Sequence, residues 1–187
     1  MINVAIFASG EGSNAENLMH HFANDTRLKI KLLITNKDDA GVIARAEKYK
    51  KIIQIISKEA LNNYSAKIVE FLKGEKIDFI ILAGFLLKIP NDLIRAFPEK
   101  IINIHPSLLP KYGGKGMYGL HVHKAVIENK EKESGITVHF VNEEYDKGKI
   151  ILQEKCGVSE NETAETLAQK IHNLEYEYFP KAIEKLL

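Results

Sequence analysis

The architecture of this chain follows from one stretch, Val4-Ala5-Ile6-Phe7-Ala8-Ser9-Gly10-Glu11-Gly12-Ser13-Asn14-Ala15. Residues 4–8 are an apolar run without polar interruption, which is typical of a strand buried on both faces of a parallel sheet. Two glycines then break the strand, and we expect Ser13 or Asn14 to cap a helix. A strand, a tight turn and a helix in this order predict the opening of a βαβ unit.

The same alternation continues through the first half of the chain. Apolar runs at residues 30–34, 52–56 and 79–83 predict three more strands, and residues 40–50 and 61–73 predict helices between them. Short connections favour right-handed crossovers. We therefore expect an α/β fold, a Rossmann-like open twisted sheet that is mostly parallel and has helices on both faces.

The second half predicts a different ending to this sheet. Residues 100–105 form a strand that ends at Pro106, and a loop over 106–120 precedes a helix at 121–129. Residues 136–141 and 149–158 predict two strands joined by turn formers, so we expect an antiparallel C-terminal strand pair. From Thr163 the apolar spacing predicts a last helix, which Pro180 should kink or restart.

Composition limits the class of protein. The 187 residues are 45% hydrophobic without a visible linker, which favours a single domain over 1–187. Lys+Arg 26 against Asp+Glu 25 gives a net charge of +1, which disfavours nucleic-acid binding through bulk charge. Cys156 is the single cysteine, which excludes a disulfide framework. No apolar run approaches ~18 residues and no leader precedes the first strand, so we expect a cytoplasmic protein without membrane contact.

The loop Gly10-Glu11-Gly12-Ser13-Asn14-Ala15 fits the pattern G-x-G-x-x-G/A between a strand and a helix. Glycines let backbone N–H groups approach an anion, and the start of a helix favours negative charge. Three interpretations stay open: a dinucleotide site, a single phosphate held by Gly12, Ser13 and Asn14, or a turn that binds nothing. A nicotinamide dinucleotide would require an acidic residue where this sequence has Thr35-Asn36-Lys37.

A second candidate site lies at the end of the strand over residues 100–105. Residues two apart share a face of a strand, so Asn103 and His105 project together at the carboxyl end, where α/β sheets bind ligands. The amide can donate to a developing oxyanion, and the imidazole can act as acid or base near neutral pH. Asp146 could hold and charge this imidazole, although composition alone favours a plain turn aspartate.

The remaining histidines are candidate metal ligands. His121 and His123 have a spacing seen in metal sites, and His139 follows in the sequence. No acidic residue lies within the pair, and a catalytic zinc requires three defined ligands, so we predict no metal. We expect His20 and His21 to lie on an exposed helix face.

Four segments together resemble the folate-dependent formyltransferases. They are Ser9-Gly10-Glu11-Gly12-Ser13-Asn14, Leu82-Ala83-Gly84-Phe85, Asn103-Ile104-His105-Pro106-Ser107-Leu108-Leu109-Pro110, and Gly135-Ile136-Thr137-Val138-His139-Phe140-Val141 with the later Asp146-Lys147-Gly148. The resemblance covers essentially the whole chain. Its first segment favours the phosphoribosylglycinamide formyltransferase branch over methionyl-tRNA formyltransferase and formyltetrahydrofolate deformylase, whose additional domains have no place in this length.

This resemblance implies an activity and a set of site residues. The activity is formyl transfer from 10-formyltetrahydrofolate, a cosubstrate, to the amine of 5-phosphoribosylglycinamide in de novo purine biosynthesis. The catalytic roles fall on Asn103, which donates to the formyl oxygen, His105, the general acid–base, and Asp146, which keeps His105 protonated and orders water. The substrate-binding residues are Gly12, Ser13, Asn14, His172 and Glu175. The folate-binding residues are Phe85, Leu86, Leu87, Lys88, Ile89, Asn103 and Tyr145. His121 matches a histidine behind the catalytic residues.

Two other functions stay open beside this one. One is a Rossmann-type nucleotide- or dinucleotide-binding protein, which dinucleotides alone would stabilise in a thermal-shift screen. The other is a formyltetrahydrofolate deformylase. In each case we expect small-molecule ligands, no nucleic acid, and a monomer or weak homodimer.

Overall fold

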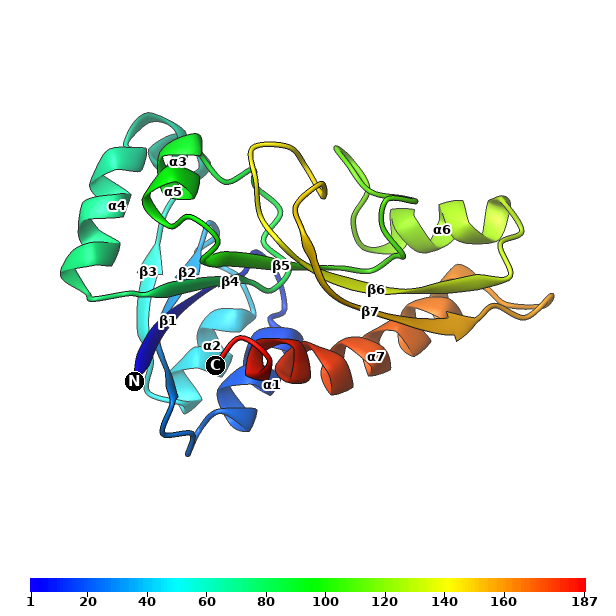
Figure 1. Ribbon diagram of the computed structural model, residues 1–187, viewed down its shortest axis with the longest axis horizontal. Helices are drawn as coiled ribbons and strands as arrows, with labels where there is room; N and C mark the ends of the chain where they lie inside the picture. The colour runs from blue at the N-terminus through cyan, green and yellow to red at the C-terminus, as the bar shows by residue number, and fades with distance from the viewer. The chain divides into compact units, whose positions relative to one another are not determined.

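The computed structural model describes residues 1–187, which residue contacts divide into two compact units. The first unit comprises residues 1–102 with Leu187, and the second comprises residues 103–186. The sheet has seven strands in the order β3-β2-β1-β4-β5-β6-β7, and β5 (Ile101–His105) contains the division between the units (Figure 1). The predicted α/β sheet, mostly parallel with an antiparallel C-terminal strand pair, is confirmed. One domain over 1–187 stays a prediction.

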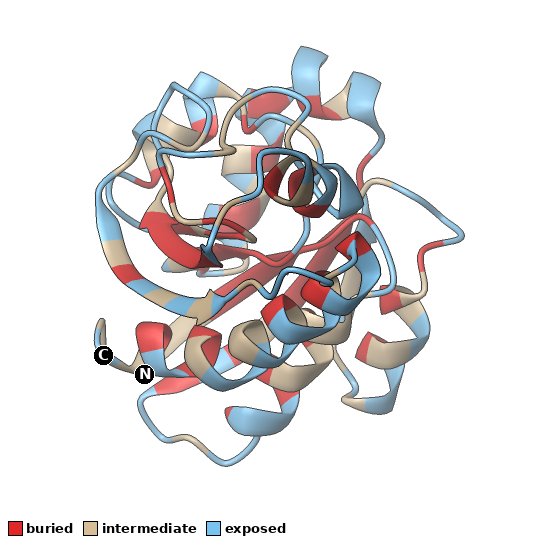
Figure 2. Cartoon of the chain, turned by 90° about the vertical axis from the view of Figure 1, so that its right-hand side faces the viewer, coloured by how far each residue is buried: buried red, intermediate tan, exposed pale blue.

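The first unit contains a parallel four-stranded sheet. Its strands are β1 (Ile2–Phe7), β2 (Leu28–Thr35), β3 (Ile52–Ile55) and β4 (Phe79–Leu82). Its helices are α1 (Ser13–His21), α2 (Val42–Lys48), α3 (Lys58–Asn63), α4 (Ser65–Gly74) and α5 (Asn91–Ala96). Figure 1 shows α1 and α2 on one face of this sheet and α4 and α5 on the other. Because both faces are covered, residues 4–8 are fully buried, and the central strands are red in Figure 2.

The strand order reverses between β1 and β4, the place where open α/β sheets bind ligands. Ser9 ties the two strand ends together. Its backbone N–H donates to the Gly84 carbonyl at 3.1 Å, and its Oγ accepts from the Leu86 N–H at 2.9 Å. The same hydroxyl donates to Asn36 Oδ1 at 2.6 Å. The loop after β1 and the segment after β4 therefore form one rim in the first unit.

The second unit is built on a hairpin and two helices. Strands β6 (Glu133–Phe140) and β7 (Ile150–Gly157) pair antiparallel. Helix α7 (Ala164–Glu184) packs on both strands and contacts α6 (Leu120–Glu128). A capping box between Thr163 and Thr166 starts α7, and Leu167 and Ile171 lie on its buried face. None of the helices in the chain combines the length and the apolar character that crossing a bilayer needs.

Two predictions about helix starts were wrong. Helix α1 is capped by Gly12, at φ 73°, and not by the side chain of Ser13 or Asn14. The sharp turn after β1 requires a left-handed residue, so the helix starts one residue earlier than a side-chain cap would allow. The helix expected over residues 61–73 is two helices, α3 and α4, which meet at Tyr64 with φ −127°. Ser57 caps α3, accepting from the Ala60 N–H at 3.1 Å.

Two further differences involve proline. Pro180 does not restart the last helix, because α7 continues to Glu184 and the residues around Pro180 are buried. Packing of that apolar face outweighs the one backbone hydrogen bond that proline removes. The short helix α5 was not predicted, and it begins directly after Pro90, whose extended conformation precedes the first turn.

Candidate active site

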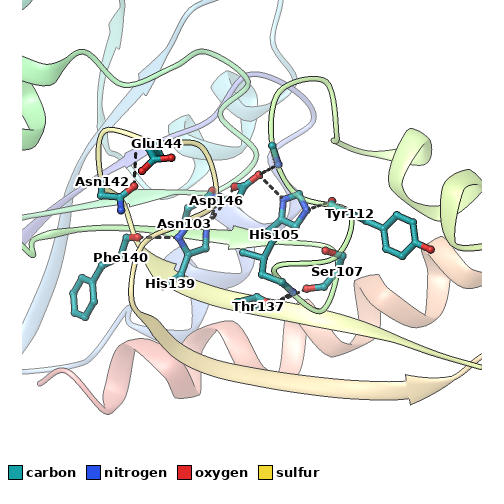
Figure 3. A network of polar contacts seen from close by, with 12 residues as sticks. Asn103, His105, Ser107, Tyr112, Thr137, His139, Phe140, Asn142, Glu144 and Asp146 are labelled. Carbon is teal, nitrogen blue, oxygen red and sulfur yellow. Dashed lines mark hydrogen bonds and ion pairs between the residues drawn. The ribbon is translucent and has the colours of Figure 1, made fainter. Parts of the chain in front are cut away.

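Asn103, His105 and Asp146 lie together in the second unit, with His139 beside them (Figure 3). His105 Nδ1 lies 3.6 Å from Asp146 Oδ2, and His139 Nε2 lies 3.6 Å from Asp146 Oδ1. The Asn103 amide donates to His139 Nε2 at 3.3 Å. Strand β5 supplies two of these residues, β6 supplies His139, and the loop before β7 supplies Asp146. One carboxylate therefore lies between two imidazoles.

Backbone carbonyls determine where the protons of both imidazoles lie. His105 Nε2 lies 2.8 Å from the Tyr112 carbonyl, and His139 Nδ1 lies 2.8 Å from the Phe140 carbonyl. A carbonyl can only accept, so each of these nitrogens carries a hydrogen and donates it. Neutral His105 therefore has its unprotonated Nδ1 toward Asp146. A proton taken up by His105 arrives on Nδ1, beside the carboxylate.

Burial and charge act on His105 in opposite directions. Burial lowers the pKa of His105, whereas the Asp146 charge and the hydrogen bond to Tyr112 raise it, and the net pKa lies below the ordinary value. The Asp146 carboxylate thus acts in the expected direction, toward the protonated imidazole, but burial outweighs it. The catalytic role of Asp146 stays a prediction. A lowered pKa favours the neutral imidazole of His105 near neutral pH.

Asp146 itself is held in its ionised form. Burial alone would raise the pKa of this carboxyl group, but the two neighbouring imidazoles and the Gly114 N–H, which donates to Asp146 Oδ2 at 2.8 Å, together lower it. Asp146 adopts a left-handed φ of 55°, which aspartate tolerates in turns. A Cβ on Gly148 would lie 1.7 Å from the Phe140 carbonyl oxygen, so only glycine fits there. The turn that presents the carboxylate thus requires glycine at position 148 and a residue that tolerates a left-handed φ at position 146.

The segment after His105 is held by β6 and β7. Thr137 Oγ1 accepts from the Leu109 N–H at 3.0 Å and donates to the Ser107 carbonyl at 2.7 Å. Gln153 Nε2 donates to the Leu109 carbonyl at 2.8 Å. These buried bonds satisfy the irregular backbone that follows β5.

Helix α7 carries the two predicted substrate residues of the second unit. Glu175 Oε2 lies 3.3 Å from His172 Nδ1. The Glu175 charge also raises the pKa of His105 and of His123 against the larger effect of burial.

Of the two histidines in the first turn of α6, His123 is buried, at 5% exposure, and His121 is exposed. The match of His121 to a histidine behind the site was therefore wrong. Helix α6 starts at Leu120, and His123 lies on its buried face together with Val122 and Val126.

The glycine loop belongs to the first unit. A Cβ on Gly12 would lie 2.3 Å from Val42 Cγ2, whereas a Cβ on Gly10 would meet nothing within 4 Å. Ser13 and Asn14 form the first turn of α1, where backbone N–H groups have no acceptor in the helix and can bind an anion. At the end of β2, a dinucleotide would meet the amide of Asn36 in place of a carboxylate.

The predicted folate segment divides into core and exposed residues. Phe85 and Ile89 are 9% and 3% exposed, and the Phe85 ring packs edge-on against Phe7 with centroids 5.3 Å apart. Leu86 is 51% exposed, Leu87 is half-buried and Lys88 is exposed. The segment is irregular, and α5 begins after it. Leu86, Leu87 and Lys88 are therefore accessible to a ligand. Phe85 and Ile89 instead anchor the segment in the core.

The predicted residues fall into two groups, which are described within their own units. Gly12 to Asn14 and Phe85 to Ile89 lie in the first unit, and the others, including the 42% exposed Tyr145, lie in the second. Sequence reasoning considered His139 only as a metal ligand and missed its contacts with Asn103 and Asp146. No group of three or more His, Cys, Asp or Glu side chains in the chain is arranged to hold a metal ion. His20 and His21 are exposed, as predicted.

Fold and site together define an α/β protein in which a buried imidazole lies beside a carboxylate at the end of a sheet strand. The family described as formyl transferase matches residues 2–183, and the chain belongs to that family. It is 38% identical over 197 residues to "Phosphoribosylglycinamide formyltransferase" of Bacillus subtilis (strain 168), covering 100% of this chain and 95% of the relative. It is 40% identical over 186 residues to the chloroplastic enzyme of that name from Arabidopsis thaliana, covering 96% of this chain and 63% of the relative.

Solved structures give the same result. The crystal structure of phosphoribosylglycinamide formyltransferase from Bacillus halodurans superposes with a TM-score of 0.89 at 36% identity, covering 99% of this chain and 95% of that chain. The chain spans 63% and 60% of the length of the plant relatives from Arabidopsis thaliana and Vigna unguiculata.

Proposed function

We propose that this chain transfers the formyl group of 10-formyltetrahydrofolate to the amine of 5-phosphoribosylglycinamide, a step of de novo purine biosynthesis. The observation that carries the proposal is the pairing of His105 with Asp146 beside the Asn103 amide. Membership of the formyl transferase family and relatives of this activity support it. The folate is a cosubstrate that is consumed in each turnover.

The chemistry begins when the amine nitrogen of the ribonucleotide attacks the formyl carbon. The formyl oxygen becomes an oxyanion, to which Asn103 donates the N–H that His139 does not use. His105 Nδ1 takes the proton that the attacking nitrogen loses, and the lowered pKa of His105 suits this base role. The nearby carboxylate of Asp146 stabilises the imidazolium. The tetrahedral intermediate then collapses, the bond to the folate nitrogen breaks, and His105 returns the proton to that nitrogen.

The ribonucleotide and the folate would bind to different residues. The substrate phosphate would bind the backbone at Gly12, Ser13 and Asn14, because a helix start favours an anion. The Glu175 carboxylate, with His172, would accept a hydrogen bond from the glycinamide group. Leu86 and Leu87 of the first unit would form an apolar wall for the pterin, with Lys88 exposed next to them in sequence. Tyr145, in the second unit, stays a predicted folate-binding residue.

The test is a product assay with each substrate withheld in turn. The purified chain receives 10-formyltetrahydrofolate with and without phosphoribosylglycinamide, and mass spectrometry follows formylated ribonucleotide and free formate. Formylated ribonucleotide that forms only with both substrates supports the proposal. Formate released without the amine would instead indicate a deformylase, and no turnover with stabilisation by NAD or NADP would indicate a dinucleotide-binding protein.

We also infer small-molecule partners only, a cytoplasmic location and a monomeric or weakly dimeric state. The near-zero net charge of +1 and the single cysteine support this inference. The names of the two plant relatives place them in chloroplasts, so relatives occupy more than one compartment. Cell fractionation and sedimentation at several concentrations test the two statements.

A further inference from the structure

A carboxylate away from the reacting atoms holds two side chains of the loop that follows β5. Glu131 Oε1 accepts a hydrogen bond from the Tyr112 hydroxyl at 3.0 Å. Lys111 Nζ donates to both Glu131 oxygens, at 3.0 and 3.1 Å. Lys111 and Tyr112 lower the pKa of Glu131, so the carboxylate stays charged. We name this group of three residues the Glu131 clamp.

The backbone of the clamped tyrosine reaches the catalytic histidine. In Figure 3 the Tyr112 ring points away from His105, while the Tyr112 carbonyl accepts the hydrogen of His105 Nε2 at 2.8 Å. Tyr112 has a left-handed φ of 55°, which a tyrosine does not prefer. Such a conformation persists only where surrounding contacts determine it. Ser107 holds the preceding carbonyl, that of Lys111, at 2.6 Å, and the Glu131 clamp holds the side chains.

We propose that Glu131 is a positioning residue that fixes the tautomer of His105 through the backbone of Tyr112. The clamp holds the Tyr112 side chain, the side chain holds the left-handed backbone, and the carbonyl keeps the hydrogen on His105 Nε2. Nδ1 is thereby left unprotonated toward Asp146, ready to take the proton. The effect on catalysis rests on the proposed function, whereas the effect on the tautomer does not.

A purely electrostatic action of Glu131 is the competing explanation. The charged and titratable groups that act on His105 are Asp146, His139 and Glu175, and His105 in turn acts on His123. The structure connects Glu131 to His105 by hydrogen bonds through Tyr112. Substitutions that separate the hydrogen bond from the charge therefore distinguish the two explanations.

Three variants make this separation. Tyr112→Phe removes the hydrogen bond and keeps both the charge and the carbonyl. Glu131→Gln removes the charge and keeps an oxygen that accepts from the hydroxyl, and Glu131→Ala removes both. The residues border an open pocket of about 530 Å³, so these changes leave the core of the unit untouched. The matched control is Glu133→Ala, which breaks an exposed ion pair with Lys155, at 2.7 Å, that has no connection to His105.

We expect kcat to fall about tenfold in Tyr112→Phe and Glu131→Ala, with KM nearly unchanged, since supporting hydrogen bonds of a functional histidine have effects of this size. The Tyr112 carbonyl raises the pKa of His105, so a misplaced carbonyl lowers it and moves the acid limb of the kcat profile to lower pH. Glu131→Gln should retain most of the activity, and Glu133→Ala should behave like the unmodified enzyme.

The ring ¹⁵N shifts of His105, measured by NMR on the labelled chain without substrates, give a readout that does not depend on activity. The unmodified chain should show hydrogen on Nε2, and Tyr112→Phe and Glu131→Ala should show a mixture of tautomers. An unchanged tautomer in folded Tyr112→Phe would overturn the proposal, as would a change in Glu131→Gln that Tyr112→Phe lacks. If the chain transfers no formyl group, the proposed function fails while the tautomer measurement still decides this inference.

Discussion

The loop after β1 and the cluster at the end of β5 are the two regions to which the proposed reaction assigns the phosphate and the formyl group. The loop is built from backbone: Gly12 has a φ of 73°, and Val42 fills the space that a side chain would need. The cluster is built from side chains, which β5, β6 and the loop before β7 bring to one carboxylate. The loop therefore depends on local shape, whereas the cluster depends on contacts between segments distant in sequence. Substitutions should therefore fail in different ways in the two regions.

The largest effect should come from removing the imidazole that accepts the proton in the proposed reaction. His105→Ala should lower kcat by at least ~10²-fold, because the proton acceptor is lost. Steady-state rates of the purified variant test this, with circular dichroism to check folding. His121→Ala is the matched control, since that histidine is exposed and should be replaceable. A kcat close to the unmodified value would remove His105 from the mechanism.

Breaking the loop should first damage the fold. Gly12→Val places a branched side chain in a left-handed residue and against Val42, which should destabilise the protein by about 3 kcal/mol. Denaturant unfolding measures the change. Gly10→Ala provides the contrast, because a Cβ at Gly10 meets no protein atom within 4 Å and stability should hold. Unchanged stability would show that the loop can rearrange around α2.

Asp146→Asn tests the charge of the cluster separately from its shape. The carboxylate raises the pKa of His105, so its removal should lower that pKa further and move the acid limb of the kcat profile to lower pH. The imidazolium formed in the reaction also loses its counter-ion, and kcat should fall about tenfold or more. An acid limb that moved to higher pH would contradict the assigned direction. The pH profile of kcat gives both readings.

Leu86→Asp tests the segment after β4, which Ser9 joins to the loop after β1. A charge at this 51% exposed side chain would lie against the pterin and should weaken binding of a folate analogue about tenfold or more. Calorimetry with the analogue and with the ribonucleotide tests the change, and ribonucleotide binding should survive. Ile52→Asp, at 46% exposure on β3, is the matched control. Equal analogue affinity in both variants would exclude Leu86 from the folate site.

The smallest effect should come from Gly10→Ala, which tests whether the backbone of the glycine loop contacts the substrate phosphate. A Cβ there meets no protein atom within 4 Å, so stability should hold. The methyl group would stand where the phosphate approaches, and KM for the ribonucleotide should rise about threefold, with little change for folate. A rise confined to the folate would assign the loop to the other ligand.

Much of the fold could be predicted because strands buried on both faces are continuous apolar runs, as in β1 and β4. The starts of β2 and β6 lie before the predicted residues, since Leu28-Lys29 and Glu133-Ser134-Gly135 interrupt the apolar pattern. Helix breaks and caps were harder to predict. The break at Tyr64 depends on a backbone angle that many side chains tolerate. The left-handed cap at Gly12 was missed because Ser13 and Asn14 next to it are themselves good capping residues.

The site could be predicted where its geometry is local. Asn103 and His105 are two residues apart on one strand, so their common face follows from the period of a strand. Asp146 remained one of two interpretations, because spacing in sequence does not give the 3.6 Å distance to His105. His139 shares a strand face with Thr137, and that alternation was the available signal. The net pKa of His105 depends on its burial, which no motif contains.

The carboxylate between two imidazoles would also determine how much charge the second unit buries during the proposed turnover. With Nε2 of His139 accepting from Asn103 and Nδ1 of His105 bare, Asp146 gives the resting group one negative charge. In the proposed reaction the attacking amine gives one proton to His105 Nδ1, which leaves the group without net charge. Neutralisation is favourable where water is scarce. The proposed proton transfer would thus replace an isolated buried charge by a neutral ion pair at the moment when the nucleophile loses its proton.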